Sequence, residues 1–223
     1  MRLNKDHNLS GTLIVVEGID GSGKSTQLAL LRDWLTSVLG DIIFTEWNSS
    51  KLISETIKEA KKKNILSPRT FSLLHAIDFA DRLEQIIVPP LKAGFIVLAD
   101  RYVYTAFARD VARGVDPNWV RNMYGFSVKP DLSLYFKVPV KTSLDRICLN
   151  REPKFYEAGM DLHLSNDIYE SYKLFQGKVI TEYDRMVDEF GLIQINAGET
   201  IHNQQLLFRD IVRKKLSEKG IKV

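Results

Sequence analysis

Cysteine is scarce in this sequence: Cys148 is the single one among 223 residues, which excludes an intrachain disulfide. Its apolar neighbours on a predicted helix favour a buried packing role for this thiol. A chain without disulfides fits a reducing compartment, so we predict a cytoplasmic location. No apolar run approaches the ~18 residues of a membrane span, and the polar start of the chain lacks the core of a secretory signal. We therefore expect no membrane partner.

Histidine and net charge are also limited. The four histidines are scattered without the spacing of metal ligands, which argues against a zinc site. The net charge is only +3, and the densest basic run is Lys61-Lys62-Lys63, which we interpret as a solvated helix end. We therefore expect no nucleic-acid partner. A modest basic excess suits an enzyme whose substrates are phosphate anions.

Short apolar strands alternate with longer amphipathic helices, which predicts an α/β fold with a mainly parallel sheet covered on both faces. The predicted strands cover residues 12–17, 42–45, 95–99, 132–136 and 192–195. The predicted helices cover residues 24–39, 52–63, 67–87, 117–126, 140–149, 165–189 and 199–217. Pro89-Pro90 is expected to end the third helix. Repeats and long linkers are lacking, so we predict a lead-in over residues 1–11 and one domain over residues 12–223.

A glycine-rich loop follows the first predicted strand and opens the first predicted helix. Gly18 to Thr26 (GIDGSGKST) satisfies G-x-x-x-x-G-K-[ST], whose glycines let successive backbone N–H groups surround phosphate oxygens. Lys24 is expected to reach the β- and γ-phosphates, and Ser25 to hold Mg²⁺. The predicted cofactors are therefore ATP and Mg²⁺. The loop residues predicted to bind them are Gly18, Asp20, Gly21, Ser22, Gly23, Lys24, Ser25 and Thr26.

Asp100, Arg101 and Tyr102 follow the third predicted strand. Ligands of open α/β sheets bind beyond the carboxyl ends of the strands. There the Asp100 carboxylate can orient Mg²⁺ or its water, and the planar Arg101 guanidinium can grip two phosphoryl oxygens. An isolated Asp-Arg pair is more often a structural salt bridge, so the functional interpretation depends on this position after a strand.

Residues 146–164 (RICLNREPKFYEAGMDLHL) form a basic stretch between two predicted helices. The stretch contains Arg146, Arg151 and Lys154 and few strongly apolar residues. We interpret residues 150–165 as a lid that closes over bound phosphates and excludes water. The alternative is a solvated loop with incidental charges.

Three stretches resemble the thymidylate kinase family of nucleoside monophosphate kinases. They are VVEGIDGSGKSTQ, ADRLEQIIVPPLKAGFIVLADRYVYTAFA and KPDLSLYFKVPVKTSLDRI, and the similarity extends from about Leu13 to the C-terminus. The resemblance implies a three-layer P-loop NTPase fold with a five-stranded parallel sheet of order 2-3-1-4-5. It also implies an ATP donor, Mg²⁺, nucleotide substrates and often a homodimer.

The resemblance also suggests roles for single residues. Asp20 would contact the acceptor sugar or the metal shell, Arg101 would bind the acceptor phosphate, and Arg151 would be the lid arginine. Arg82 would lie near the acceptor base, and the loop of Asn196 would receive the donor adenine. With the loop lysine, the predicted catalytic residues are Lys24, Arg101, Arg151 and Asp20. The predicted substrate-binding residues are Glu46, Asp78, Arg82, Arg101 and Tyr102, and the predicted metal ligands are Ser25 and Asp100.

The acceptor half of the predicted site departs from the family pattern. Residues 45–49 read TEWNS where the family usually has an Arg-Glu-Pro-Gly-Gly segment. Asp78 stands where the family usually has a phenylalanine that stacks on thymine, and Ala106 and Arg109 replace other usual acceptor contacts. Asp78 could face a base edge or pair with Arg82 one helical turn away, and we favour the pairing.

These observations favour ATP- and Mg²⁺-dependent phosphoryl transfer to a nucleoside monophosphate, with dTMP first among the candidates. Two alternatives stay open. A nucleoside kinase of related fold would use Glu46 as a general base for a hydroxyl acceptor. A nucleotide-binding regulatory protein would keep the glycine-rich loop and lack an acceptor site.

Overall fold

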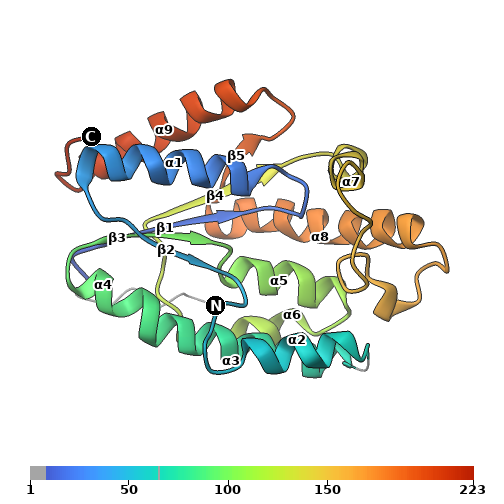
Figure 1. Ribbon diagram of the computed structural model, residues 1–223. Helices are drawn as coiled ribbons and strands as arrows, with labels where there is room; N and C mark the ends of the chain where they lie inside the picture. Colours follow the sequence, from blue (N-terminus) through green and yellow to red (C-terminus); the bar gives the residue numbers. More distant parts are fainter. Residues whose placement is uncertain (1–8, 65) are drawn as a thin grey trace.

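The computed structural model describes residues 9–64 and 66–223, and within them a sheet of parallel strands forms the centre of the molecule (Figure 1). The strand order is β2-β3-β1-β4-β5, as the family resemblance implies. The strands are β1 (Thr12–Glu17), β2 (Ile43–Glu46), β3 (Ile96–Asp100), β4 (Leu132–Lys137) and β5 (Ile193–Asn196). All carboxyl ends therefore meet at one edge of the sheet. Residues 1–8 of the predicted lead-in lie outside the described residues.

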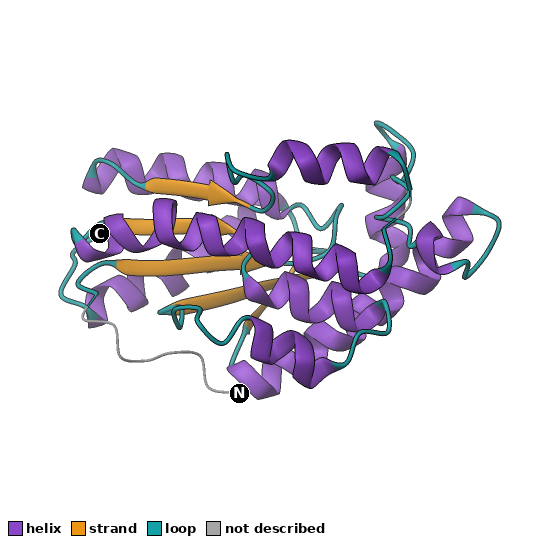
Figure 2. Cartoon of the chain, turned by 90° about the horizontal axis from the view of Figure 1, so that it is seen from below, coloured by secondary structure: helices purple, strands orange, loops and turns teal. Residues whose placement is uncertain are grey.

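Helices cover both faces of the sheet (Figure 1). One face carries α1 (Lys24–Leu39) and α9 (Ile201–Glu218), and the other carries α5 (Val103–Ala112) and α8 (Ile168–Phe190). Figure 2, a view from below, shows helices lying over the strands on the face of the sheet that is turned toward the viewer. The remaining helical elements are α2 (Ser54–Lys62), α3 (Pro68–Arg82), η1 (Leu83–Ile87), α4 (Val88–Lys92), α6 (Pro117–Met123), α7 (Val140–Cys148) and η2 (Met160–Leu162).

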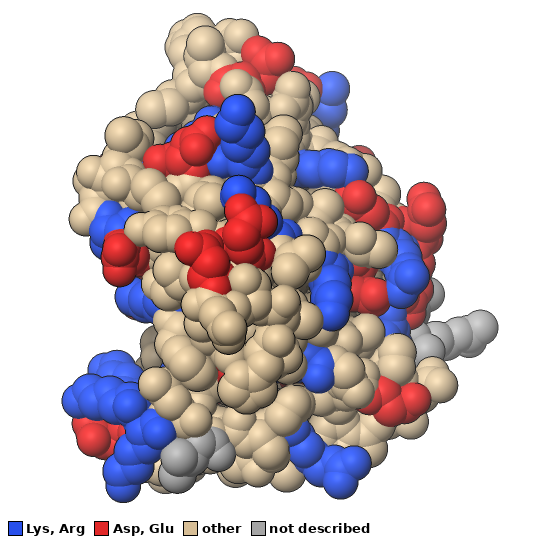
Figure 3. All heavy atoms as spheres, turned by 90° about the vertical axis from the view of Figure 1, so that its right-hand side faces the viewer, with Lys and Arg blue, Asp and Glu red and all other residues tan. Residues whose placement is uncertain are grey.

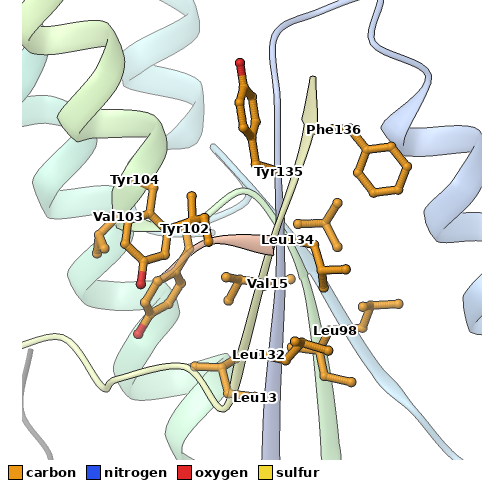
Figure 4. Packing of buried hydrophobic residues seen from close by; sticks show 14 of the residues in the cluster. Leu13, Val15, Leu98, Tyr102, Val103, Tyr104, Leu132, Leu134, Tyr135 and Phe136 are labelled. Carbon is orange, nitrogen blue, oxygen red and sulfur yellow. The ribbon is translucent and has the colours of Figure 1, made fainter. Parts of the chain in front are cut away.

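The inner strands are largely apolar, with polar residues only near their ends, because both of their faces are covered. Every residue of β1 and β3 is buried. Side chains such as Val15, Leu98 and Leu134 pack between the layers (Figure 4). Full burial of such a side chain contributes about 1.5–3 kcal/mol. This rigid centre fixes the positions of the polar residues at the strand ends.

The prediction that Pro89-Pro90 ends a helix is wrong, because the chain stays helical from α3 through η1 into α4. η1 is a π-helical turn, in which the N–H of Val88 donates to the carbonyl of Leu83, five residues back. The wider turn lets Pro89 enter the first turn of α4, where a missing N–H costs little.

Helix α5 is an element that the sequence analysis did not predict. All of its residues except Arg109 and Val111 are buried, so it lacks the polar stripe that gives a surface helix its period. Tyr102 at its N-cap supplies no capping side chain. The N–H groups of Tyr102 and Thr105 donate instead to the carboxylate of Glu17, at 2.8 and 3.2 Å. The start of α5 thus depends on a distant residue.

Cys148 is exposed at the end of α7, so the predicted buried role of its thiol is wrong. Ser143, Leu144 and Ile147 are the residues of α7 that turn inward. Cys148 follows Ile147 and is therefore rotated about 100° toward solvent. In the part of the chain that the structure describes, no helix is long and apolar enough to span a membrane.

Candidate active site

The glycine-rich loop lies between β1 and α1 at the carboxyl edge of the sheet. Gly21 and Gly23 have φ angles of 75° and 85°, which disfavour residues with a side chain. A Cβ atom on Gly21 would lie 2.5 Å from the carbonyl oxygen of Ser143. The Asp20 carbonyl accepts hydrogen bonds from Ser143 Oγ (2.7 Å) and Tyr172 OH (3.3 Å). The loop is therefore held in shape by α7 and α8.

Lys24, Ser25 and Asp100 lie together, as predicted, where this loop meets the end of β3. Lys24 Nζ lies 3.1 Å from Asp100 Oδ1, and Ser25 Oγ donates to Asp100 Oδ2 at 3.3 Å. Burial lowers the pKa of Lys24, and the nearby Arg101 lowers it further. The Asp100 carboxylate thus holds the lysine in a confined position beside the glycine-rich loop.

The pair of Ser25 and Asp100 fits the chemistry of a bound Mg²⁺. No cluster of three or more acidic, histidine or cysteine side chains that could hold a metal occurs in residues 9–64 and 66–223. Mg²⁺ in phosphoryl-transfer sites needs no such cluster, because one or two protein oxygens, waters and substrate phosphates complete its shell. The donor set is therefore suited to a metal that arrives with a nucleotide.

Asp20 connects the glycine-rich loop to two arginines. Its carboxylate pairs with Arg101 and with Arg109, the latter at 2.6 Å. Burial alone would raise the pKa of Asp20, but the two guanidinium groups outweigh burial and hold this pKa well below its usual range. Asp20 therefore stays ionised at neutral pH and fixes both arginines beside the loop.

Arg101 is held in an unusual backbone conformation at the end of β3. Its φ angle is 71°, in the left-handed region that few residues with a side chain adopt. Its N–H donates to Val16 O at 2.9 Å, and its Nη1 donates to Gly18 O at 2.9 Å. Strained backbone of this kind is concentrated at functional sites. Glu17, which the sequence analysis did not single out, supports this turn by capping α5 directly after it.

A cavity of about 690 Å³ opens next to Asp20, between α2, α3, α5 and residues 151–157. Figure 3 looks onto this edge of the molecule, where basic and acidic side chains are interspersed. The lining is rich in cations and aromatic rings, which suits an anionic ligand with a flat ring. The lining residues are Asp20, Lys58, Lys61, Lys62, Asn64, Phe71, Arg109, Arg113, Arg151, Lys154, Phe155, Tyr156 and Glu157.

The predicted lid folds against α5 and α8 and covers one side of this cavity. Arg113 Nη2 donates to Tyr156 O at 2.6 Å, and Gln176 Nε2 donates to Glu157 O at 2.7 Å. Arg151 lines the cavity and makes two hydrogen bonds to the Glu157 carboxylate, at 2.7 and 3.0 Å. An arginine that acts on phosphate would have to exchange this partner, so the role of Arg151 stays a prediction.

Arg146 joins the glycine-rich loop to the loop that follows β5. Its Nη1 donates to Ser22 O at 3.3 Å, and its Nη2 donates to Ala197 O at 2.9 Å. Asn196 Oδ1 accepts from Gly198 N at 3.0 Å and shapes the same loop. Arg146 thus bridges the loop expected to receive the donor adenine and the loop expected to bind the phosphates.

The expected ion pair between Asp78 and Arg82 does not form among the described residues. The Asp78 carboxylate instead accepts hydrogen bonds from the N–H groups of Ser50 (3.0 Å) and Asn48 (3.1 Å). Two backbone donors of a loop without other partners compete successfully for this carboxylate. Asp78 therefore shapes the loop after β2.

Arg82 is fully buried away from the cavity lining, although it was predicted to lie near the acceptor base. Its Nε donates to Thr45 Oγ1 at 3.3 Å, and its guanidinium lies 5.7 Å from the centre of the Trp47 ring. Its Nη1 and Nη2 atoms have no hydrogen-bond partner within the described residues. The contact of Arg82 with a base stays a prediction.

Two further expectations meet a different placement, and a third residue, Glu46, lies where it was predicted. Tyr102 is buried in the core, where its hydroxyl donates to Val128 O at 2.9 Å and its ring packs on Phe79, so the side chain does not face the cavity. Glu46 is exposed at the end of β2. Lys61, interpreted as part of a solvated helix end, lines the cavity instead, with its Nζ over the Phe71 ring at 5.1 Å from the ring centre.

The structure brings Glu17, Lys61 and Arg113 to the site, although no local sequence signal marks these residues. Arg109 was noticed only as a departure from the family pattern. One signal could have found the two arginines: Arg109 and Arg113 are four residues apart, a spacing that places both on one side of a helix. Lys61 carried no such signal because it lies among other lysines.

A strand, a glycine-rich loop and a helix, with Lys24 and Ser25 directed at the carboxylate of the neighbouring strand, define a P-loop nucleotide-binding protein. The family model for thymidylate kinase matches residues 16–203. The chain belongs to the thymidylate kinase family.

Relatives from distant organisms are similar to the chain over most of its length. The protein from Saccharolobus solfataricus named probable thymidylate kinase 2 is 45% identical over 206 residues, which cover 92% of this chain and 96% of that protein. The probable thymidylate kinase of Thermococcus kodakarensis is 33% identical, over 86% of this chain and 93% of that protein. The thymidylate kinase of Brachyspira hyodysenteriae is 26% identical, over 81% and 89% respectively.

Proposed function

We propose that the protein is a thymidylate kinase that transfers the γ-phosphoryl group of ATP to dTMP in the presence of Mg²⁺. The observation that carries the proposal is the arrangement of Lys24 and Asp100 next to a cationic cavity that begins at Asp20. A donor nucleotide on the glycine-rich loop and an acceptor in this cavity would bring two phosphate groups together there. The names of the relatives indicate the same reaction.

The residues of the site would act by positioning and by neutralising charge. Lys24 would lie against the β- and γ-phosphates, and Arg101 would bind the acceptor phosphate beside it. Mg²⁺, held by Ser25 and Asp100, would neutralise charge on the donor phosphates when bound. The acceptor phosphate is itself a nucleophile, so the reaction needs no strong base. Fixed donors in a confined site lower the barrier because they need no rearrangement.

Asp20 would organise the acceptor side of the site. It holds Arg101 and Arg109 through one carboxylate, so both guanidinium groups would face the region between donor and acceptor. Residues 151–157 cover the cavity and would exclude water from the transferred group. A dry site favours transfer to dTMP over hydrolysis of ATP.

The proposal includes a cytoplasmic homodimer without a nucleic-acid or membrane partner. Leu73 and Ile77 on α3 are both 45% exposed and lie one helical turn apart, as on a surface that meets a second copy. Multi-angle light scattering would measure the mass in solution. A monomer across the micromolar range would contradict this part of the proposal and leave the reaction untouched.

The reaction is tested by ADP release from Mg-ATP against a panel of nucleosides and nucleoside monophosphates. We expect selective turnover with dTMP, and loss of detectable transfer in Lys24→Ala. Lys214→Ala is the matched control, because this lysine is exposed on α9 and, within residues 9–64 and 66–223, its ion pair is with Asp210. ATP binding without transfer to any acceptor would favour the regulatory alternative. Transfer to nucleosides that is lost in Glu46→Gln would favour the nucleoside kinase.

A further inference from the structure

Three consecutive carbonyl groups in residues 156–158 accept hydrogen bonds from side chains of neighbouring helices. The pairs are Arg113 Nη2 with Tyr156 O (2.6 Å), Gln176 Nε2 with Glu157 O (2.7 Å) and Ser171 Oγ with Ala158 O (2.8 Å). Gln176 and Ser171 belong to α8, whereas Arg113 is the residue that caps the end of α5. These carbonyl groups lie at the end of the segment that lines the cavity next to Asp20. Arg113 therefore ties this segment to a second helix.

The side chain of Arg113 is almost completely enclosed. It is 1% exposed and lies between two aromatic rings, with the guanidinium carbon 4.3 Å from the centre of Phe71 and 4.5 Å from that of Phe175. Its Nε donates to Asp161 Oδ2 at 3.0 Å, and its Nη1 donates to Arg109 O at 3.2 Å. A guanidinium stays protonated when it is buried, and enclosing its charge is costly unless hydrogen-bond partners compensate. These contacts compensate the cost and fix the plane of the group.

The chemistry of Arg113 indicates a role beyond core packing. A buried ion pair is weak evidence for stability, because apolar side chains of similar volume often serve as well. The space between two phenylalanine rings would suit methionine or leucine. A planar group with five N–H donors can instead reach a carboxylate and two carbonyl groups from separate parts of the chain at once. Arg113 is therefore a junction between segments.

The junction lies directly beside charged groups of the site. Glu157 follows Tyr156 and holds Arg151 through two hydrogen bonds, at 2.7 and 3.0 Å. On α5, Arg109 lies one helical turn before Arg113 and pairs with the carboxylate of the glycine-rich loop at 2.6 Å. Arg113 thus joins the stretch of backbone that positions Arg151 to the helix that carries Arg109.

A second cavity, of about 490 Å³, also borders Arg113. It is lined by the end of α5, by Leu162 and Leu164, and by the middle of α8. Arg113 lines both this cavity and the one next to Asp20. The segment around Arg113 thus borders open space at two places. Such a segment depends more on single hydrogen bonds than an element packed in the core does.

We propose that Arg113 is a positioning residue for phosphoryl transfer, which holds residues 151–157 over the cavity and thereby keeps Arg151 at the site. This inference rests on the proposed function. When the contact with Tyr156 is lost, the segment opens more often, Arg151 leaves the cavity and water enters beside the transferred group. ATP binding on the glycine-rich loop does not require this contact, because Lys24 and Ser25 are held by Asp100.

Limited proteolysis tests the contact without reference to activity. Trypsin cleaves after Arg151 and Lys154, and cleavage of a folded protein requires local opening. In Arg113→Met, a flexible apolar side chain can pack between the same two rings and the hydrogen bonds are lost. We expect cleavage at these two sites to be about tenfold or more faster than in wild type, as for the loss of other charged hydrogen bonds.

Arg121→Met is the matched control. The Arg121 guanidinium on α6 also lies over two aromatic rings, those of Phe107 and Phe190, and makes two hydrogen bonds to Glu189. Its loss should leave cleavage in residues 151–157 within about twofold of wild type. Thermal melts of both variants separate a general loss of stability from a local opening.

A second variant keeps the test valid if Arg113→Met does not fold. Asp161→Asn leaves the arginine in place and weakens the contact that orients its Nε. One oxygen of this carboxylate, Oδ1, has no hydrogen-bond partner within the described residues, so the exchange for an amide disturbs little else. We expect cleavage after Lys154 to be about threefold or more faster than in wild type.

A kinetic cycle tests whether Arg113 acts through Arg151. Arg113→Met should lower kcat for dTMP about tenfold or more, while the KM for ATP stays within about twofold. ADP release without dTMP should rise relative to transfer, because water reaches the open site. In an Arg151→Ala background, Arg113→Met should lower kcat by less than about twofold further, because the group that it positions is absent.

Three outcomes would overturn the inference. Wild-type cleavage rates in Arg113→Met would mean that the contacts with α8 hold the segment without it. Additive losses of kcat in the cycle would mean that Arg113 acts independently of Arg151. A weaker affinity for dTMP with unchanged kcat and cleavage would mean that Arg113 contacts the ligand itself. Failure of wild type to phosphorylate dTMP would overturn the proposed function, and the cleavage rates would still report whether Arg113 holds the segment.

Discussion

Thr105 Oγ1 donates a 2.6 Å hydrogen bond to Glu17 Oε2, which ties the first turn of α5 to the last residue of β1. The same carboxylate accepts from the N–H groups of Tyr102 and Thr105 and from the hydroxyl of Tyr183. Glu17 is therefore the N-terminal cap of a helix that begins 86 residues later in the chain. Arg101 directly precedes the capped turn, so its position depends on this contact.

Replacement of Glu17 should impair both folding and turnover. Glu17→Ala leaves buried donors without an acceptor, and we expect the free energy of unfolding to fall by about 3–5 kcal/mol. The kcat for dTMP should fall at least tenfold because Arg101 loses its support. In Glu17→Gln the amide oxygen still accepts from the backbone and the hydroxyl groups can reverse, so most stability should remain. Urea unfolding and steady-state kinetics measure these effects.

Glu55→Ala is the control for Glu17, since Glu55 is exposed and pairs with Lys58 on the surface of α2. Its effect on the free energy of unfolding should stay below about 1 kcal/mol. Unchanged kcat in Glu17→Ala would show that α5 keeps its start without this carboxylate.

Gly159 should resist substitution more strongly than another glycine of the same backbone conformation. Gly159 and Gly191 have φ angles of 66° and 70°, so Ala is strained at both. At Gly159 a Cβ atom would also lie 2.6 Å from the ring of Phe175, whereas at Gly191 it would meet nothing within 4 Å. We expect losses of unfolding free energy of about 2–4 kcal/mol for Gly159→Ala and about 1 kcal/mol for Gly191→Ala. Chemical denaturation measures both.

The same pair tests the role of residues 150–165. Gly159 follows the part of this segment that lines the cavity, so Gly159→Ala should also raise the KM for dTMP, while Gly191→Ala leaves it unchanged. Equal stabilities of the two variants would mean that this segment is loosely packed against α8.

Asp110 should make the protein less stable as the pH rises through the acidic range. Burial raises the pKa of Asp110 to about 6, although nearby arginines oppose the shift. Between pH about 4 and about 6 the folded protein keeps a proton that the unfolded chain releases, so the free energy of unfolding falls with rising pH. In Asp110→Asn, the part of this decrease in unfolding free energy that Asp110 causes, about 1–3 kcal/mol between pH about 4 and about 6, should be absent. Urea unfolding from pH 4 to pH 8 measures it.

Asp33→Asn serves as the control for Asp110, because the Asp33 side chain is 72% exposed on α1. Its pH profile should match that of wild type. If the unfolding free energy of Asp110→Asn also depends on pH as in wild type, then Asp110 ionises in the folded protein as it does in the unfolded chain.

Lys61 should make acceptor binding depend on pH near neutrality. Burial, followed by the charges of Arg109 and Arg113, lowers the pKa of Lys61 to about 7. The ammonium form is present below this pH, so the affinity for dTMP should fall as the pH rises from about 6 to about 8. The nucleotide phosphate itself ionises near pH 6, so the quantity to compare is the ratio of wild-type to Lys61→Met affinity. A ratio that is constant with pH would contradict the prediction.

The sequence predicted which residues lie together around the glycine-rich loop because the signals for them are local. The glycine-rich loop, its lysine and the aspartate after β3 each follow an apolar strand, and parallel strands bring their ends together without further information. Asp20 was also identified, since it lies within the loop. The five strands were located to within one residue because their apolar runs are short and bounded by turn residues, although the edge strands β2 and β5 keep exposed residues.

The acceptor half could not be predicted because it depends on contacts between distant residues. Glu17 replaces the local cap of α5, His75 decides which lysine of α2 turns inward, and Asp78 is taken by backbone donors of another loop. Periodicity and propensity describe neighbours along the chain. They do not indicate which buried group will satisfy a polar atom from elsewhere, and tertiary contacts of this kind override local preferences.

Cys148 gives this chain a ready position for spectroscopic labelling. It is the single cysteine, and its thiol is exposed three residues before Arg151, where the segment that covers the cavity begins. A maleimide dye or a nitroxide will therefore attach at one known point without removal of competing thiols. Fluorescence or electron paramagnetic resonance at that point can follow the segment as ATP and dTMP bind, in the otherwise unaltered protein.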